Sequence, residues 1–163
     1  MQLLNSHLVS LERGKAMQGM SMTRQITIPT GQVIYRFYDS GRAPTPQLGA
    51  DGAWWLEYEY FQAVKHFALR NGYTLSYAAR LFAAVLYEWS EVNAFVACRT
   101  TTPLYAWKGR GKQVQSSGKD SRDLPTMTPM QSILEVYQLY VPGLGCPGSI
   151  SNQALLVQSH GLA

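Results

Sequence analysis

The order of its apolar segments restricts the folds open to this chain more than any other feature. Two consecutive segments, residues 54–70 and 74–89, repeat apolar side chains at helical spacing. Runs rich in β-branched and aromatic residues flank them and predict strands, at residues 25–28, 33–38, 92–98, 104–107, 132–141 and 154–157. The run at 132–141 also fits a helix. Strands, two helices and further strands are typical of an α+β domain rather than of alternating βαβ units.

Length and composition fit a single domain. The 163 residues are 46% hydrophobic and 15% charged, enough to bury a core without disulfides or metal ions. We therefore expect one compact α+β domain over residues 23–163, with two small packed β-sheets and two central helices. Residues 1–22 end in a stretch with three methionines and two glycines, which predicts a short helix followed by a flexible leader.

Nothing in the sequence predicts a membrane segment or a metal site. No apolar run reaches the length of about 18 residues that a membrane helix needs, and no export signal is evident at the amino terminus. We expect a cytoplasmic protein with no membrane contact, and delivery into another cell stays open. The two cysteines, Cys98 and Cys146, lie far apart and outside any ligand spacing, so we expect reduced, packed thiols.

Arg36 stands inside the apolar run at residues 33–38. A guanidinium in such a strand needs a partner, because burying an unpaired charge is very unfavourable. One candidate is a structural ion pair with a carboxylate, and the acidic residues considered are Glu57, Glu59 and Glu135. The other is a ligand phosphate, to which Arg42 in the following Gly/Pro-rich loop would add a second positive charge.

Positive charge gathers between residues 99 and 122. Six basic residues of this segment face a single acidic one, Asp120, whereas the whole chain has a net charge of +4. Such a surplus suits a nucleic acid or a phosphate-bearing ligand, although a solvated basic loop is the simpler explanation. The candidate nucleic-acid contacts are Lys108, Arg110, Lys112 and Lys119.

Trp54 and Trp55 form an aromatic pair next to two glutamates. A pair of this kind in a cleft can stack against nicotinamide, adenine or a target base. Packing in the core is the alternative for at least one of the two indoles.

Three short motifs occur in order along the chain. IYRFYDSGRAP combines a Tyr-Arg pair with an Asp and an Arg-x-Pro turn, VACRTTTP ends a strand with a threonine run, and VYQLYVPG sets a glutamine ahead of Pro-Gly. Together they resemble the ADP-ribosyltransferase toxins of the cholera toxin and pierisin type. The first motif matches at Tyr35, Arg36, Asp39, Arg42 and Pro44, with two additional residues before the aspartate.

The resemblance implies an ADP-ribosyltransferase-like split β-core that uses NAD as a substrate. It implies that Arg36 braces the NAD phosphates, with Tyr35 and Arg42 nearby. It also implies that hydroxyls of the threonine run orient the catalytic carboxylate and line the nicotinamide site, the candidates being Thr100, Thr101 and Thr102. A threonine run before a proline is also an ordinary strand end.

Gln138 falls where the resembled family has its catalytic glutamate. A carboxylate there stabilises the positive charge that develops on the ribose, whereas a glutamine hydrogen-bonds without neutralising it. Either Gln138 marks a binding-only or silenced form, or Glu135 supplies the charge, or the motif matches in another register. On a regular strand Glu135 would point to the opposite face from Gln138, and a bulge or helical turn would bring the two together.

Our leading hypothesis is a bacterial NAD-dependent ADP-ribosyltransferase toxin or effector that modifies a nucleic acid or a protein. Gln138 or Glu135 would occupy the catalytic position, and an antitoxin or immunity protein would be its partner. One alternative is a non-catalytic basic module that binds nucleic acid or a protein, which accounts directly for the glutamine. A second alternative is an NAD glycohydrolase, in which water is the acceptor.

Overall fold

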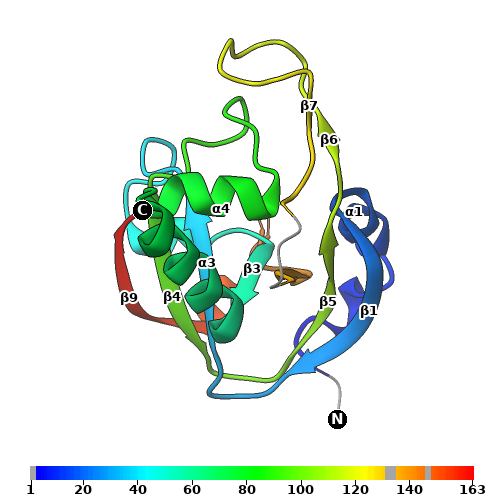
Figure 1. Cartoon of the computed structure of the whole chain (residues 1–163). Coiled ribbons are helices and arrows are strands. Elements are labelled where there is room, and N and C mark those ends of the chain that lie inside the picture. The colour runs from blue at the N-terminus through cyan, green and yellow to red at the C-terminus, as the bar shows by residue number, and fades with distance from the viewer. Residues whose placement is uncertain (1–2, 131–134, 146–147) are drawn as a thin grey trace.

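Seven antiparallel strands form the frame of the molecule (Figure 1). The computed structural model describes residues 3–130, 135–145 and 148–163, and it confirms the expected α+β fold. In spatial order the strands are β1 (Met20–Ile28), β5 (Leu104–Gly111), β8 (Tyr137–Tyr140), β3 (Trp54–Glu57), β2 (Val33–Tyr38), β4 (Ala94–Thr100) and β9 (Leu155–Leu162). A small second sheet pairs β6 (Val114–Gln115) with β7 (Thr126–Met127).

Strand β3 joins two halves of the large sheet. It pairs with β8 through Trp54 and Trp55, and with β2 through Leu56 and Glu57, so each side has two residue pairs. The half formed by β1, β5 and β8 packs against the half formed by β2, β4 and β9 around a common hydrophobic core. The two packed sheets expected from the sequence correspond to these halves.

The helices lie outside this frame. They are the 3₁₀ helix η1 (Ser6–Leu8), α1 (Arg13–Gly19), α2 (Pro46–Gly49), α3 (Tyr58–Asn71), α4 (Leu75–Ala83) and α5 (Ser151–Ala154). The two longest, α3 and α4, pack together over the half that contains β2 and β4 (Figure 1). No helix in the described part of the chain is long and apolar enough to cross a membrane.

Both predicted helices are shorter in the structure. The first begins at Tyr58, because residues 54–57 pair as β3 instead. The second starts at the Thr74 cap, whose hydroxyl accepts a hydrogen bond from the Tyr77 amide, and ends at Ala84, where φ is +53°. The periodic pattern that continues to Trp89 therefore belongs to a loop.

The amino-terminal segment differs from the flexible leader that we expected. The side chain of Asn5 is fully buried and makes three hydrogen bonds of 2.9 Å, to both backbone groups of Tyr105 and to the Pro142 carbonyl. Ala16 and Met20 are also fully buried. Residues 3–22 thus cover the β5–β8 half, and Met20 begins the edge strand β1. The strand predicted at residues 104–107 is longer in the structure, because β5 continues its pairing with β1 to Gly111.

Cys98 is fully buried in the core and makes no disulfide. Burial raises the pKa of its thiol to about 12, so the thiol stays protonated at neutral pH. This agrees with the packed, reduced state expected from the sequence. Cys146 lies outside the described residues.

Replacement of Asn5 tests whether the amino-terminal segment is part of the folded domain. We expect Asn5→Ala to lower the free energy of unfolding by about 3 kcal/mol, because buried backbone groups of Tyr105 and Pro142 lose their partner. Urea unfolding measures this change. The exposed neighbour His7 provides the control, and His7→Ala should leave the free energy of unfolding unchanged. Equal stabilities of the two variants would contradict the packed arrangement.

Candidate functional site

A cavity of about 1110 Å³ lies between the sheet, α4 and the loops that follow β2, α4 and β5. This volume exceeds the range of roughly 300–1,000 Å³ usual for small-molecule sites, so a ligand as large as a dinucleotide fits. The wall combines aromatic rings with charged groups. Its polar and indole side chains include Lys15, Arg36, Asp39, Arg42, Asp51, Trp54, Trp89, Lys112 and Gln138.

Gln138 lines this cavity, and one atom of its side-chain amide is unpaired. The residue is 8% exposed, and its Nε2 atom is buried without a hydrogen-bond partner among the described residues. The backbone of β5 passes close by, since a Cβ atom added at Gly111 would lie 2.9 Å from that nitrogen. Buried polar groups are nearly always paired in folded proteins, so this unpaired nitrogen marks Gln138 as a candidate functional residue.

Arg36 is held by backbone carbonyls rather than by a glutamate. Its Nε donates to the Gly49 carbonyl at 3.0 Å and its Nη1 to the Trp54 carbonyl at 3.2 Å. Gly52 leaves the space for this arrangement, because a Cβ atom there would overlap the guanidinium. The expected ion pair with Glu57, Glu59 or Glu135 is not what holds it. Arg36 nevertheless lines the cavity.

The charge on Arg36 persists at neutral pH. Burial lowers the pKa of its guanidinium to about 10, and the nearby Asp51 carboxylate opposes this shift. The cavity wall therefore carries a fixed positive charge that is already anchored by two hydrogen bonds. Such a group can attract an anionic ligand while its own position stays constant.

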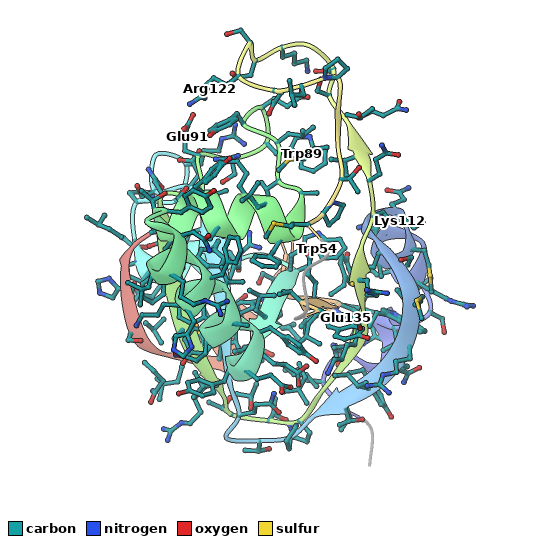
Figure 2. The ribbon with its side chains drawn as sticks, viewed as in Figure 1. Trp54, Trp89, Glu91, Lys112, Arg122 and Glu135 are labelled. Carbon is teal, nitrogen blue, oxygen red and sulfur yellow. The ribbon has the colours of Figure 1, made fainter. Side chains whose placement is uncertain are left out.

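Further positive charge lies at the rim of the cavity. The Arg42 side chain is exposed, and its Nη1 donates to the Trp89 carbonyl at 2.6 Å. Lys112, also exposed, donates from Nζ to the Met17 carbonyl at 2.5 Å. Figure 2 shows Trp54 near the middle of the molecule, with Trp89 above it and Lys112 to the right. Lys112 thus brings positive charge to the rim, and so does Arg42, whose Nε also pairs with Asp39 at 3.7 Å.

The threonine run does not reach the cavity. The buried Thr100 hydroxyl donates to the Pro29 carbonyl at 2.7 Å and accepts from the Gln32 amide, which joins the end of β4 to the start of β2. Thr101 donates to the Gln153 carbonyl at 3.0 Å. Neither they nor Thr102 line the cavity, so the strand-end interpretation describes the run. Sequence could not show this, because a hydroxyl that caps a strand and one that contacts a ligand look alike.

Tyr35 lines the cavity and also packs against α3. Its ring stacks on Phe61 of α3 with a centroid separation of 4.2 Å, and burial raises the pKa of its hydroxyl. Of the two tryptophans, Trp55 is 1% exposed and donates from Nε1 to the Gly52 carbonyl, so it belongs to the core. Trp54 lies edge-on against Tyr140 and lines the cavity.

Glu135 does not share the cavity with Gln138. Its carboxylate pairs with Arg110 at 2.8 Å and accepts a hydrogen bond from the Tyr137 hydroxyl at 2.7 Å. The side chain does not line the large cavity. Of the two candidates for the catalytic position, Gln138 alone lines the cavity.

The predicted nucleic-acid contacts are partly neutralised within the fold. Lys108 is largely buried and pairs with Glu57 at 2.6 Å, and Arg110 pairs with Glu135. Lys112 lies at the cavity rim, and Lys119 is exposed on the loop between β6 and β7. These four cations therefore do not form one continuous basic face.

One residue of the cavity carries no sequence signal of its own. Trp89 continues the helical pattern in the sequence, yet the loop after α4 places it on the cavity with 47% of its surface exposed.

No cluster of three or more metal-ligating side chains occurs among the residues that the structure describes.

Comparisons with known proteins concern the fold. No family model and no curated protein sequence matches the chain. One solved structure, described as Rhs1-CT in complex with cognate immunity protein RhsI1, is similar with a TM-score of 0.50 and 11% identity, over 93% of this chain and 92% of that chain. Another, Tne2 in complex with Tni2, has a TM-score of 0.48 and 15% identity, over 88% and 96% of the two chains. At such identities, similarity describes the fold alone.

Removal of the Arg36 side chain tests its structural contacts. We expect Arg36→Ala to lower the free energy of unfolding by about 3 kcal/mol, because the Gly49 and Trp54 carbonyls lose a charged donor. Chemical denaturation gives this quantity. Arg42→Ala is the matched control, since the exposed side chain should contribute less than about 1 kcal/mol. An Arg36→Ala protein as stable as the control would show that the guanidinium does not hold this loop.

Proposed function

We propose that this chain is a toxin domain that binds NAD in the large cavity and hydrolyses its bond to nicotinamide. The observation that carries the proposal is the joint placement of Arg36 and Gln138. The two belong to separate motifs far apart in sequence, and both line the same cavity. Arg36 matches the phosphate-bracing arginine of the NAD-using toxins that the sequence resembles, whereas Gln138 stands where those toxins have their catalytic glutamate.

The similarity to Rhs1-CT supports the toxin part of the proposal. That domain has this fold and is described with a cognate immunity protein. A cell that makes an NAD-consuming enzyme needs to block it, so we propose an immunity protein as the partner of this chain. The simplest way for such a partner to prevent binding of NAD is to cover the mouth of the cavity.

The proposed reaction needs no acid at the leaving group. The bond from the ribose C1′ to the nicotinamide nitrogen breaks, and its electron pair leaves with nicotinamide, which becomes neutral. Water bonds to C1′ through its oxygen, and its proton passes to solvent. The Gln138 amide supplies a carbonyl dipole and N–H donors to the ribose and the water but takes up no proton.

Water suits this site better than the macromolecular acceptor expected from the sequence. Gln138 is 8% exposed, so an acceptor has to enter the cavity to reach a ribose bound beside it. Lys108 and Arg110, which we expected to hold a nucleic acid, pair with carboxylates instead. Water is small enough to enter the cavity, and it needs no basic surface to bind.

Nicotinamide release from NAD tests this proposal. The purified protein should produce nicotinamide and free ADP-ribose in equal amounts, measured by chromatography. We expect Gln138→Ala to lower the rate about 100-fold or more, the size usual for loss of a transition-state dipole. Gln25→Ala, at an exposed position of β1 that does not line the cavity, should keep the wild-type rate and serves as the control.

Three other outcomes separate the alternatives. Label from NAD on DNA, RNA or protein would indicate a transferase. Loss of activity in Glu135→Gln but not in Gln138→Ala would move the catalytic position to Glu135. Absence of both nicotinamide release and label transfer, also in Gln138→Glu, would contradict an NAD-using enzyme and favour a binding module.

A further inference from the structure

We propose that the mouth of the cavity is a purine subsite in which the exposed indole of Trp89 stacks on the adenine of the dinucleotide. The inference deepens the proposed function and rests on it for the identity of the full substrate. Trp89 is 47% exposed and lines the cavity. Stacking on indole suits a flat heteroaromatic base.

The backbone on both sides of this indole is fixed. The Trp89 amide donates to the Leu86 carbonyl at 3.0 Å, and its carbonyl accepts from Arg42 at 2.6 Å. The Asp123 carboxylate accepts from the amides of Tyr87 at 2.7 Å and Glu88 at 3.0 Å. An exposed tryptophan on an ordered loop is prepared for stacking, because little freedom is lost when a ligand binds.

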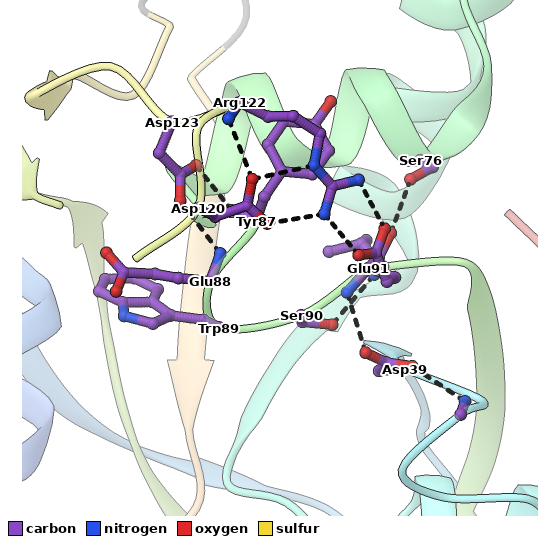
Figure 3. Close-up of polar contacts among 12 residues, drawn as sticks. Asp39, Ser76, Tyr87, Glu88, Trp89, Ser90, Glu91, Asp120, Arg122 and Asp123 are labelled. Carbon is purple, nitrogen blue, oxygen red and sulfur yellow. Dashed lines mark hydrogen bonds and ion pairs between the residues drawn. The ribbon is translucent and has the colours of Figure 1, made fainter. Parts of the chain in front are cut away.

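Two arginines and a tyrosine hold this loop, and Figure 3 shows Tyr87 and Arg122 of this group. The guanidinium of Arg80 lies 3.6 Å from the centroid of the Tyr87 ring, and that of Arg122 lies 4.2 Å from it. Arg80 is 3% exposed and donates to the carbonyls of Val85, Ser90 and Glu91. We call Arg80, Tyr87 and Arg122 the arginine clamp.

Arg122 connects the β6–β7 loop to the loop after α4. Its Nη2 pairs with Glu91 at 2.6 Å and with Asp120 at 2.8 Å, and this contact lowers the pKa of Asp120 to about 2. Ser117 of the same loop donates to the Glu88 carboxylate. The β6–β7 loop and the loop after α4 thus hold each other, and Arg122 is a positioning residue for Trp89.

The positions of Gln138, Arg42 and Trp89 along the cavity set the orientation in which a dinucleotide binds. Gln138 lies on strand β8, whereas Trp89 lies on the loop after α4, and Arg42 bonds to the backbone of Trp89 from the rim. A dinucleotide with its nicotinamide ribose at Gln138 therefore places its phosphates near Arg42 and its adenine at Trp89. Gln138, the charged Arg42 and the indole of Trp89 thus follow in the same order as the ribose, the phosphates and the adenine of the ligand.

Direct binding of ADP tests the subsite without any need for catalysis. We expect ADP to quench the tryptophan fluorescence of the full chain, and titration calorimetry to give about tenfold or more weaker binding for Trp89→Ala. Trp89→Phe should keep most of the affinity. Tyr77→Ala is the control, because Tyr77 is 42% exposed on α4 and does not line the cavity.

Kinetics with two substrates separate the subsite from the reaction. In Trp89→Ala the KM for NAD should rise about tenfold or more with kcat nearly unchanged, whereas cleavage of nicotinamide mononucleotide, which has no adenine, should not change. Arg122→Ala should raise the KM for NAD in the same way but less, and Arg122→Lys should restore it in part.

The outcomes distinguish this inference from the proposed function. Trp89-dependent binding of ADP by a protein that does not cleave NAD would keep the subsite and contradict the hydrolase. Cleavage of NAD with an unchanged KM in Trp89→Ala would contradict the subsite alone. A wild-type protein that does not bind ADP, or a Trp89→Ala protein that binds it equally well, would overturn the purine subsite.

Discussion

The hydrogen bonds from Arg36 to the carbonyls of Gly49 and Trp54 are the contacts on which the rest of the site depends. They fix the loop that leads into β3, and β3 is the strand that joins the two halves of the sheet. With two residue pairs on either side, that strand is held weakly by its own ladder. The Arg36 guanidinium therefore helps to hold the two halves of the sheet together, and it also lines the cavity between them.

The chemistry of the cavity follows from what its polar groups are able to do. A glutamine at position 138 offers a dipole and donors but no charge, so the proposed reaction depends on alignment of water and ribose rather than on proton transfer. The basic side chains of the wall are instead suited to phosphate, and they lie beside the carboxylates of Asp39 and Asp51. Arg36 is fixed within the sheet, whereas Arg42 also bonds to the loop that carries Trp89. In the proposed complex, one side chain would therefore link the binding of phosphate to the stacking of a base.

Sequence predicted the features that local pattern determines. The α+β class, most strands and both long helices follow from apolar periodicity, and Arg36, Arg42 and Gln138 were found because an arginine in an apolar strand and a family motif single them out. Sheet pairing and long-range contacts were not predictable in this way. The partner of Arg36 is backbone, the burial of Asn5 depends on two distant segments, and Trp89 leaves its helical pattern because Arg80 binds the carbonyls that follow α4.

The most direct measurement is a crystal structure of the full chain with carba-NAD, an analogue whose nicotinamide bond cannot be hydrolysed. The account predicts that the analogue fills the large cavity, with its nicotinamide ribose within hydrogen-bond distance of the Gln138 amide and its diphosphate beside Arg36 or Arg42. An analogue bound elsewhere on the chain, or a cavity left empty at saturating concentration, would contradict the assignment of this cavity as the NAD site.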